Sequence, residues 1–194
     1  RAGGGEPRSG RYRVAECRTR RGQPFRASAP QGQSADAPQL DSPLPESEPA
    51  RPFGPVNDAA QATTGELTVT MATRLPDQAG AAPQDVLTLR GANGLTVEGE
   101  ITGVVSPATQ IEGQTVRALL ALPVEEPQVL VYRVAGETKP ESGQGLCGGG
   151  DVAFVVVWEP SGPGDGALKA MGVSGGAPGA AGARACPMLE YRRN

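Results

Sequence analysis

Two runs of alternating hydrophobic and polar residues meet at Asn93-Gly94 and predict a β-hairpin over residues 86–101. A two-residue loop at Asn93-Gly94 would mix hydrophobic and polar residues on each face. A three-residue loop, residues 92–94 with Gly94 in the left-handed conformation, instead places Leu89 opposite Val97 and Thr88 opposite Glu98. One face is then apolar and the other polar, which is typical of a half-buried antiparallel hairpin.

Similar patterns elsewhere predict further strands. Hydrophobic and polar residues alternate strictly over residues 66–75, and the second hairpin strand is expected to reach Val105. Residues 152–158 form the most hydrophobic run and are expected to be the central strand. Other strands are expected at residues 116–122, 128–134, 167–173 and 188–192. No segment has a convincing helical pattern, so we expect an all-β fold. An antiparallel sandwich or partly closed barrel of about seven or eight strands fits this spacing.

A long irregular N-terminal arm is expected to precede this domain. The chain contains 28 glycines and 19 prolines among 194 residues, and prolines are dense in residues 27–63. Such a segment buries too little apolar surface to offset its ordering entropy. We therefore assign residues 1–63 to an Arg-rich and then Pro-rich extended arm, with one strand near residues 11–17, and residues 64–194 to the β-domain.

Charge is distributed unevenly between these two parts. Residues 1–26 carry eight arginines and two glutamates, a balance of +6, whereas the whole chain carries −3, so the remainder carries −9. The arm is therefore expected to bind an acidic protein partner, a larger complex or an anionic membrane surface, or to dock on its own acidic domain. Sparse aromatic residues and the lack of a known motif disfavour nucleic acid. The candidate partner-binding residues are Arg11, Arg13, Arg18, Arg20, Arg21, Phe25, Arg26 and Phe53.

The three cysteines lie too far apart for a recognisable metal motif. We expect a disulfide between Cys147 and Cys186, which flank the predicted strands, and a spare thiol at Cys17. The alternative is that all three are reduced. The disulfide, together with a first residue that is not Met, favours an extracytoplasmic protein that has lost a signal peptide, although a fragment would also begin this way. No apolar run is long enough to predict a transmembrane segment.

The candidate chemistry is sparse. The sequence contains no histidine, the most common general base and metal ligand near neutral pH. The glycine-rich loop at residues 162–167 lacks the following helix that a dinucleotide site needs. The acidic pair Glu98 and Glu100 is interpreted as a solvated sheet face, and Trp158 as a lid over the core. We therefore predict no catalytic residue, no metal and no cofactor.

These observations favour a non-catalytic exported β-domain. The leading hypothesis is a structural or accessory subunit that binds a larger envelope or membrane-associated assembly through its N-terminal arm. The alternative is a small-ligand-binding or enzyme-inhibitor β-module. A third hypothesis is an enzyme that uses carboxylates or Cys147.

Overall fold

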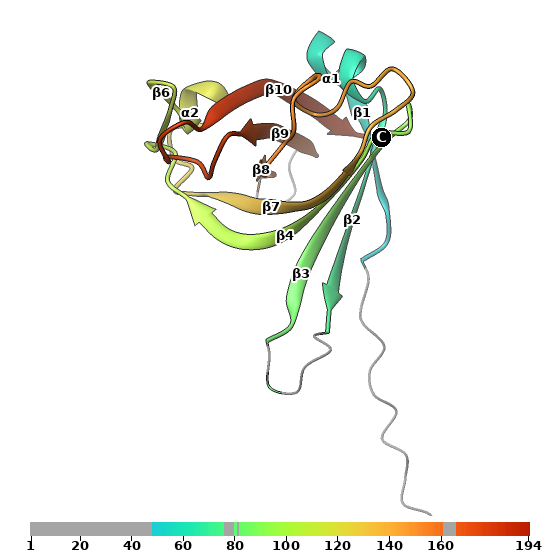
Figure 1. The fold of residues 1–194 in the computed structure, drawn as a ribbon, viewed down its shortest axis with the longest axis horizontal. Coiled ribbons are helices and arrows are strands. Elements are labelled where there is room, and N and C mark those ends of the chain that lie inside the picture. Colours follow the sequence, from blue (N-terminus) through green and yellow to red (C-terminus); the bar gives the residue numbers. More distant parts are fainter. Residues whose placement is uncertain (1–47, 76–79, 81, 161–165) are drawn as a thin grey trace, which may run out of the picture. The chain divides into compact units, whose positions relative to one another are not determined.

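The protein forms a closed, antiparallel, eight-stranded β-barrel (Figure 1). The computed structural model describes residues 48–75, 80, 82–160 and 166–194. Neighbours around the barrel follow the order β1-β10-β9-β8-β7-β4-β3-β2, so each barrel strand pairs with those next to it along the chain. The elements are β1 (Arg51–Pro55), α1 (Asp58–Thr63), β2 (Leu67–Arg74), β3 (Gln84–Gly91), β4 (Thr96–Val105), β5 (Gln110–Ile111), β6 (Gln114–Thr115), α2 (Val116–Leu119), β7 (Val129–Thr138), β8 (Phe154–Trp158), β9 (Ala167–Ser174) and β10 (Arg184–Arg193).

The β3–β4 hairpin has the predicted register. Thr88 lies opposite Glu98 and Leu89 lies opposite Val97. The turn is closed by a hydrogen bond of 2.8 Å from the Gly91 amide to the Leu95 carbonyl, which leaves residues 92–94 as a three-residue loop. Gly94 has φ of 94°, a left-handed conformation that a glycine adopts without steric cost. The expected strand at residues 66–75 is also confirmed, as β2.

The main hydrophobic core fills the barrel interior, where the inward-facing residues of the strands meet. Tyr191, Phe53 and Leu67 are among its largest fully buried side chains. Ala60 of α1 and Leu146 of the β7–β8 connection join the same core. The predicted disulfide between Cys147 and Cys186 is present, with a Cα–Cα distance of 5.1 Å, and it ties this connection to β10.

A second core lies on the outer face of β7, β8 and β9. Outward-facing Val156 and Met171 pack there against Ile111, Val116 and neighbouring residues from the segment between β4 and β7. Both faces of β8 are therefore buried, which explains the continuous hydrophobic run at residues 152–158. However, β8 is not central in its position in the sheet, because every strand of a closed barrel has two neighbours.

Residues 116–122 do not form the predicted strand. They contain the short helix α2, and the Thr115 hydroxyl accepts a hydrogen bond from the Ala118 amide as its N-cap. Short apolar runs fit a buried helix and a buried strand equally well, so the pattern could not distinguish them. A second short helix, α1, likewise went unpredicted. Its N-cap is Asn57, whose side chain accepts from the Ala60 amide.

The barrel begins earlier than the sequence suggested. Strand β1 lies within the range assigned to the extended arm, yet it pairs with both β10 and β2 and so closes the barrel. Its sequence, RPFGP, reads as a linker because proline cannot donate a hydrogen bond to a neighbouring strand. The predicted strand near residues 11–17 and the rest of the arm before Glu48 lie outside the described residues.

Candidate functional site

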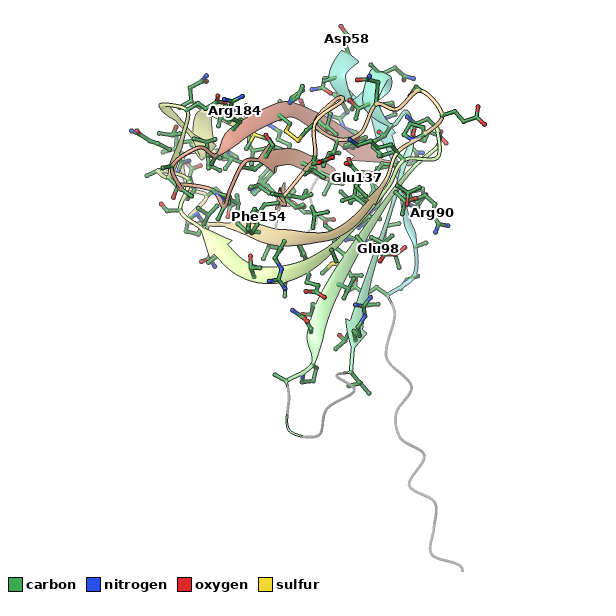
Figure 2. All side chains as sticks on the ribbon, in the orientation of Figure 1. Asp58, Arg90, Glu98, Glu137, Phe154 and Arg184 are labelled. Atoms are coloured by element: carbon green, nitrogen blue, oxygen red, sulfur yellow. A yellow bond between two sulfur atoms is a disulfide. The ribbon has the colours of Figure 1, made fainter. Side chains whose placement is uncertain are left out.

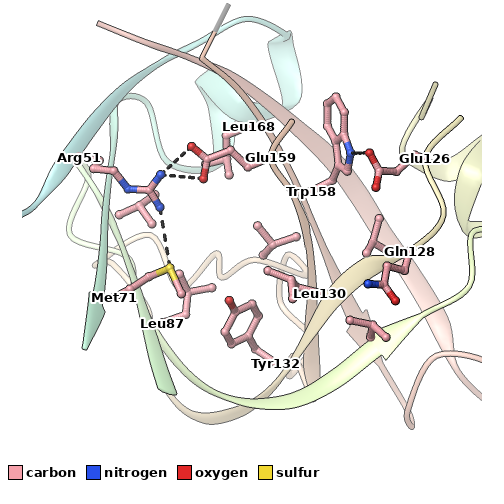
Figure 3. A pocket seen from close by; sticks show the side chains of 14 residues that line it. Arg51, Met71, Leu87, Glu126, Gln128, Leu130, Tyr132, Trp158, Glu159 and Leu168 are labelled. Carbon is pink, nitrogen blue, oxygen red and sulfur yellow. Dashed lines mark hydrogen bonds and ion pairs between the residues drawn. The ribbon is translucent and has the colours of Figure 1, made fainter. Parts of the chain in front are cut away.

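A cavity of about 240 Å³ lies at one end of the barrel. Strands β1, β3 and β7 begin at this end, and strands β2, β4 and β8 end there. Most of the cavity lining is apolar. The lining residues come from seven strands, from the segment before β7 and from Glu159 after β8. Figure 3 shows the side chains arranged around it. The lining residues used below are Arg51, Val69, Met71, Leu87, Glu126, Leu130, Tyr132, Val157, Trp158, Glu159 and Leu168.

A charged cluster forms one side of the cavity. The Nη1 atom of Arg51 lies 2.6 Å and 2.7 Å from the two carboxylate oxygens of Glu159. Arg193 also reaches Glu159, with its Nη2 atom 3.4 Å from Oε1. Both guanidinium groups lie 5.8 Å from the centre of the Phe53 ring. Two cations therefore share one carboxylate at this end of the barrel.

Arg51 retains hydrogen-bonding capacity beyond that ion pair. Its Nη2 atom lies 3.9 Å from the Met71 sulfur, which is a weak acceptor (Figure 3). Its Nε atom is buried, and no described residue accepts a hydrogen bond from it. A buried donor without a partner costs free energy. Because Nε has almost no accessible surface, Nη2 is the Arg51 donor left for a molecule in the cavity.

Tyr132 brings a hydroxyl into the same cavity. Its side chain points into the interior of the site in Figure 3, and no described residue forms a hydrogen bond with that hydroxyl. Burial raises the pKa of Tyr132, the Asp85 carboxylate raises it further, and Arg51 opposes them. The hydroxyl is therefore protonated at neutral pH and able to donate. Gly99 makes room for this residue, since a Cβ at position 99 would lie 2.9 Å from the Tyr132 Cβ.

Trp158, the last residue of β8, borders the cavity and packs in the second core on the outer face of the barrel. Its indole Nε1 donates a hydrogen bond of 2.8 Å to Glu126 Oε2, and the Lys169 ammonium lies 5.7 Å from its ring centre. Because Glu126 and Lys169 hold the ring, the indole is fixed beside the cavity. The sequence interpretation of Trp158 as part of the core is compatible with this position, since the residue is only 8% exposed.

The residues predicted to bind a partner are not gathered at this cavity. Arg11, Arg13, Arg18, Arg20, Arg21, Phe25 and Arg26 lie outside the described residues. Phe53, the remaining partner-binding candidate, is fully buried in the barrel core, so its side chain is not at the surface of the barrel. Its inward position follows from the alternation along β1, which turns Phe53 to the same face as Arg51.

The acidic pair at residues 98 and 100 lies on the outer face of β4. Glu100 pairs with Arg133 at 2.9 Å and with Arg74 at 3.7 Å, which makes it part of a surface ion-pair cluster. Within residues 48–75, 80, 82–160 and 166–194, no group of histidine, cysteine or acidic side chains is arranged to hold a metal ion.

Sequence reasoning missed Arg51, Tyr132 and Glu159. A polar residue inside a hydrophobic run is the signal that could have revealed Tyr132, whereas Arg51 and Glu159 lie beside prolines in segments that resemble loops. No helix in the described part of the chain has the length and hydrophobicity required to cross a membrane. Comparisons with family models, with curated proteins and with solved structures find no match to this chain.

Proposed function

We propose that this protein is a non-catalytic, small-ligand-binding β-barrel and that the cavity beside Tyr132 is its binding site. The observation that carries the proposal is the Tyr132 hydroxyl, which has no hydrogen-bond partner among the described residues and lies in a mostly apolar cavity. Ligand sites typically combine apolar walls with a few well-placed polar groups, and this cavity has that composition.

The size of the cavity limits the ligand. At about 30 Å³ for each water-sized group, 240 Å³ holds on the order of eight such groups. This volume lies just below the range of about 300–1,000 Å³ that is common for drug-sized ligands. We therefore expect a compact molecule, and not a long lipid or a peptide.

The disulfide supports a location outside the cytoplasm. Structural disulfides persist in oxidising compartments and are rare in the cytosol. The Cys147–Cys186 bond fixes the β7–β8 connection to β10. We propose that the protein works in an extracytoplasmic compartment, where it would meet its ligand.

Trp158 offers a direct test, because it is the single tryptophan of the chain and it lines the cavity. Its fluorescence should change on titration with 1-octanol or octanoate, two compact amphiphiles. Val69→Phe, which points into the cavity, should weaken both responses. Thr70→Phe, on the outer face of the same strand, is the control and should not. If neither compound changes the fluorescence and native mass spectrometry finds no bound small molecule, the proposal fails.

A second proposal, partner binding through the N-terminal arm, is favoured by the charge asymmetry of the chain. Arginine-rich segments associate with acidic surfaces, and this attraction weakens with salt. The test is deletion of residues 1–47, because deletion of residues 1–63 would also remove β1 and open the barrel. A shortened protein that binds its native assembly with unchanged affinity and unchanged salt dependence would contradict this second proposal.

A further inference from the structure

We infer that the cavity selects a small apolar carboxylate, whose carboxylate group binds Arg51 and Tyr132. This inference rests on the proposed function and adds the chemical class of the ligand. It follows from the donors that converge on the cavity and from the charge balance around them.

The free polar groups on the Arg51 side of the cavity are hydrogen-bond donors. Arg51 offers Nη2, whose sole described contact is the weak one to the Met71 sulfur. Tyr132 offers its hydroxyl. The carboxylate on this side, Glu159, already accepts from Arg51 and Arg193. The remaining polar side chains of the lining, Glu126 and Gln128, lie on the side away from Arg51 (Figure 3). A ligand that supplies acceptor oxygens matches this set of groups, whereas a ligand that supplies donors does not.

The charge beside Arg51 favours an anion over a neutral acceptor. Arg51 and Arg193 carry two positive charges there, and Glu159 supplies one negative charge between them. Glu126, the other acidic residue of the lining, lies away from Arg51 and accepts a hydrogen bond from Trp158 (Figure 3). A ligand carboxylate bound to Arg51 would supply a second negative charge, so that Arg51 and Arg193 together would face two carboxylates. Hydrogen bonds between ionised partners are shorter and roughly twice as strong as those between neutral groups, and planar guanidinium suits a carboxylate.

The remaining walls fit an apolar body. Val69, Leu87, Val157 and Leu168 are all buried and line the cavity. Burial of apolar surface contributes about 25 cal/mol per Å², which rewards a hydrocarbon group there. The ligand class is therefore a compact hydrocarbon with a single carboxylate.

The test compares octanoate with 1-octanol, which share a hydrocarbon chain and differ in the head group. Each is titrated at neutral pH while Trp158 fluorescence is recorded. The wild-type protein should bind octanoate about tenfold or more tightly than 1-octanol, as expected for a charge-assisted hydrogen bond.

Three variants and one matched control assign this preference to specific groups. Arg51→Met should abolish the preference while 1-octanol binding persists, and Tyr132→Phe should reduce the preference by a smaller factor. Arg90→Met, at an exposed position on the outer face of β3, is the matched control and should leave it unchanged. Glu159→Gln changes the charge in the opposite sense: by removing the carboxylate that competes for Arg51, it should tighten octanoate binding. This last variant keeps the test decisive if Arg51→Met does not fold.

Each unfavourable outcome has a distinct meaning. Equal binding of the two compounds by the wild-type protein overturns the carboxylate inference and leaves the proposed function intact. A preference that survives Arg51→Met, or octanoate binding that Glu159→Gln does not tighten, overturns the role of Arg51. Binding of neither compound removes the proposed function itself.

Discussion

The hydroxyl oxygens of Tyr191 and Thr64 lie 2.7 Å apart, although 127 residues separate them in the chain. Both side chains are buried, and the Thr64 hydroxyl also lies 3.0 Å from the Gly65 carbonyl and 3.2 Å from the Ala60 carbonyl, either of which can accept its single hydrogen. This contact joins β10 to the end of α1 in the interior of the barrel. Burial raises the pKa of Tyr191 to about 12, from its usual value near 10, and the bond to Thr64 opposes the shift.

We predict that Tyr191 makes stability fall in alkaline solution. Its pKa is raised in the folded state, so its contribution is complete below pH 10 and is lost as pH rises from about 10 to about 12. Tyr191→Phe should cost about 1 kcal/mol at pH 8 through the lost hydrogen bond and should flatten the alkaline decline. Urea unfolding at several pH values measures both effects. Equal alkaline slopes in the two proteins would contradict this prediction.

The hairpin register predicts opposite outcomes for two neighbouring lysine substitutions. Leu89 is 4% exposed and faces the barrel interior, so Leu89→Lys should reduce the free energy of unfolding by more than about 3 kcal/mol. Thr88 faces outward opposite Glu98, so Thr88→Lys should change it by less than about 0.5 kcal/mol. Chemical denaturation of both variants measures the difference, and similar losses would show that the two faces are exchanged.

The disulfide leaves no room for a side chain at Gly172. A Cβ at this position would lie 2.8 Å from the Cys147 sulfur and 3.3 Å from the Cys186 sulfur. Gly172→Ala should therefore destabilise the oxidised protein by about 1–3 kcal/mol. The cost should shrink when both cysteines are replaced by alanine. A double-mutant cycle measured by urea unfolding gives this coupling, and a cost that is the same in both backgrounds would exclude the sulfur contact as its cause.

Gly99 is expected to control the position of Tyr132. An alanine here would bring its Cβ within 2.9 Å of the Tyr132 Cβ, and neither atom can move without its backbone. Gly99→Ala should lower stability by about 1–3 kcal/mol and weaken octanoate binding. Gly136→Ala is the matched control, because nothing lies within 4 Å of the added carbon. Thermal unfolding and the Trp158 titration measure the two effects, and equal behaviour of the two variants would contradict the argument.

The sequence predicted best those strands that have one buried face and one solvent-facing face. Strands β2, β3 and β4 alternate in the way this arrangement requires, and so their positions and the hairpin register could be predicted. Strand β1 escaped detection because its prolines resemble a linker, while its strand character comes from pairing at barrel closure. Closure is also what brings Arg51 next to Glu159, which lies 108 residues away. A contact of this kind depends on the whole topology, so local patterns could not predict it.

The second core covers the outer face of only part of the barrel, so the barrel has a thick wall and a thin wall. The wall at β8 and β9 is packed on both faces, whereas Thr68, Thr88 and Glu98 mark an outer face of β2, β3 and β4 that no second core covers in the described part of the chain (Figure 2 shows Glu98 on this side). Local opening requires less free energy where fewer apolar contacts must be broken. Amide hydrogens of β8 and β9 should therefore exchange with solvent most slowly, and those of β2 and β3 faster. We therefore expect the thin wall to be the part of the barrel that opens most readily, and under the ligand-binding proposal the thick wall would be the rigid surface against which the ligand rests.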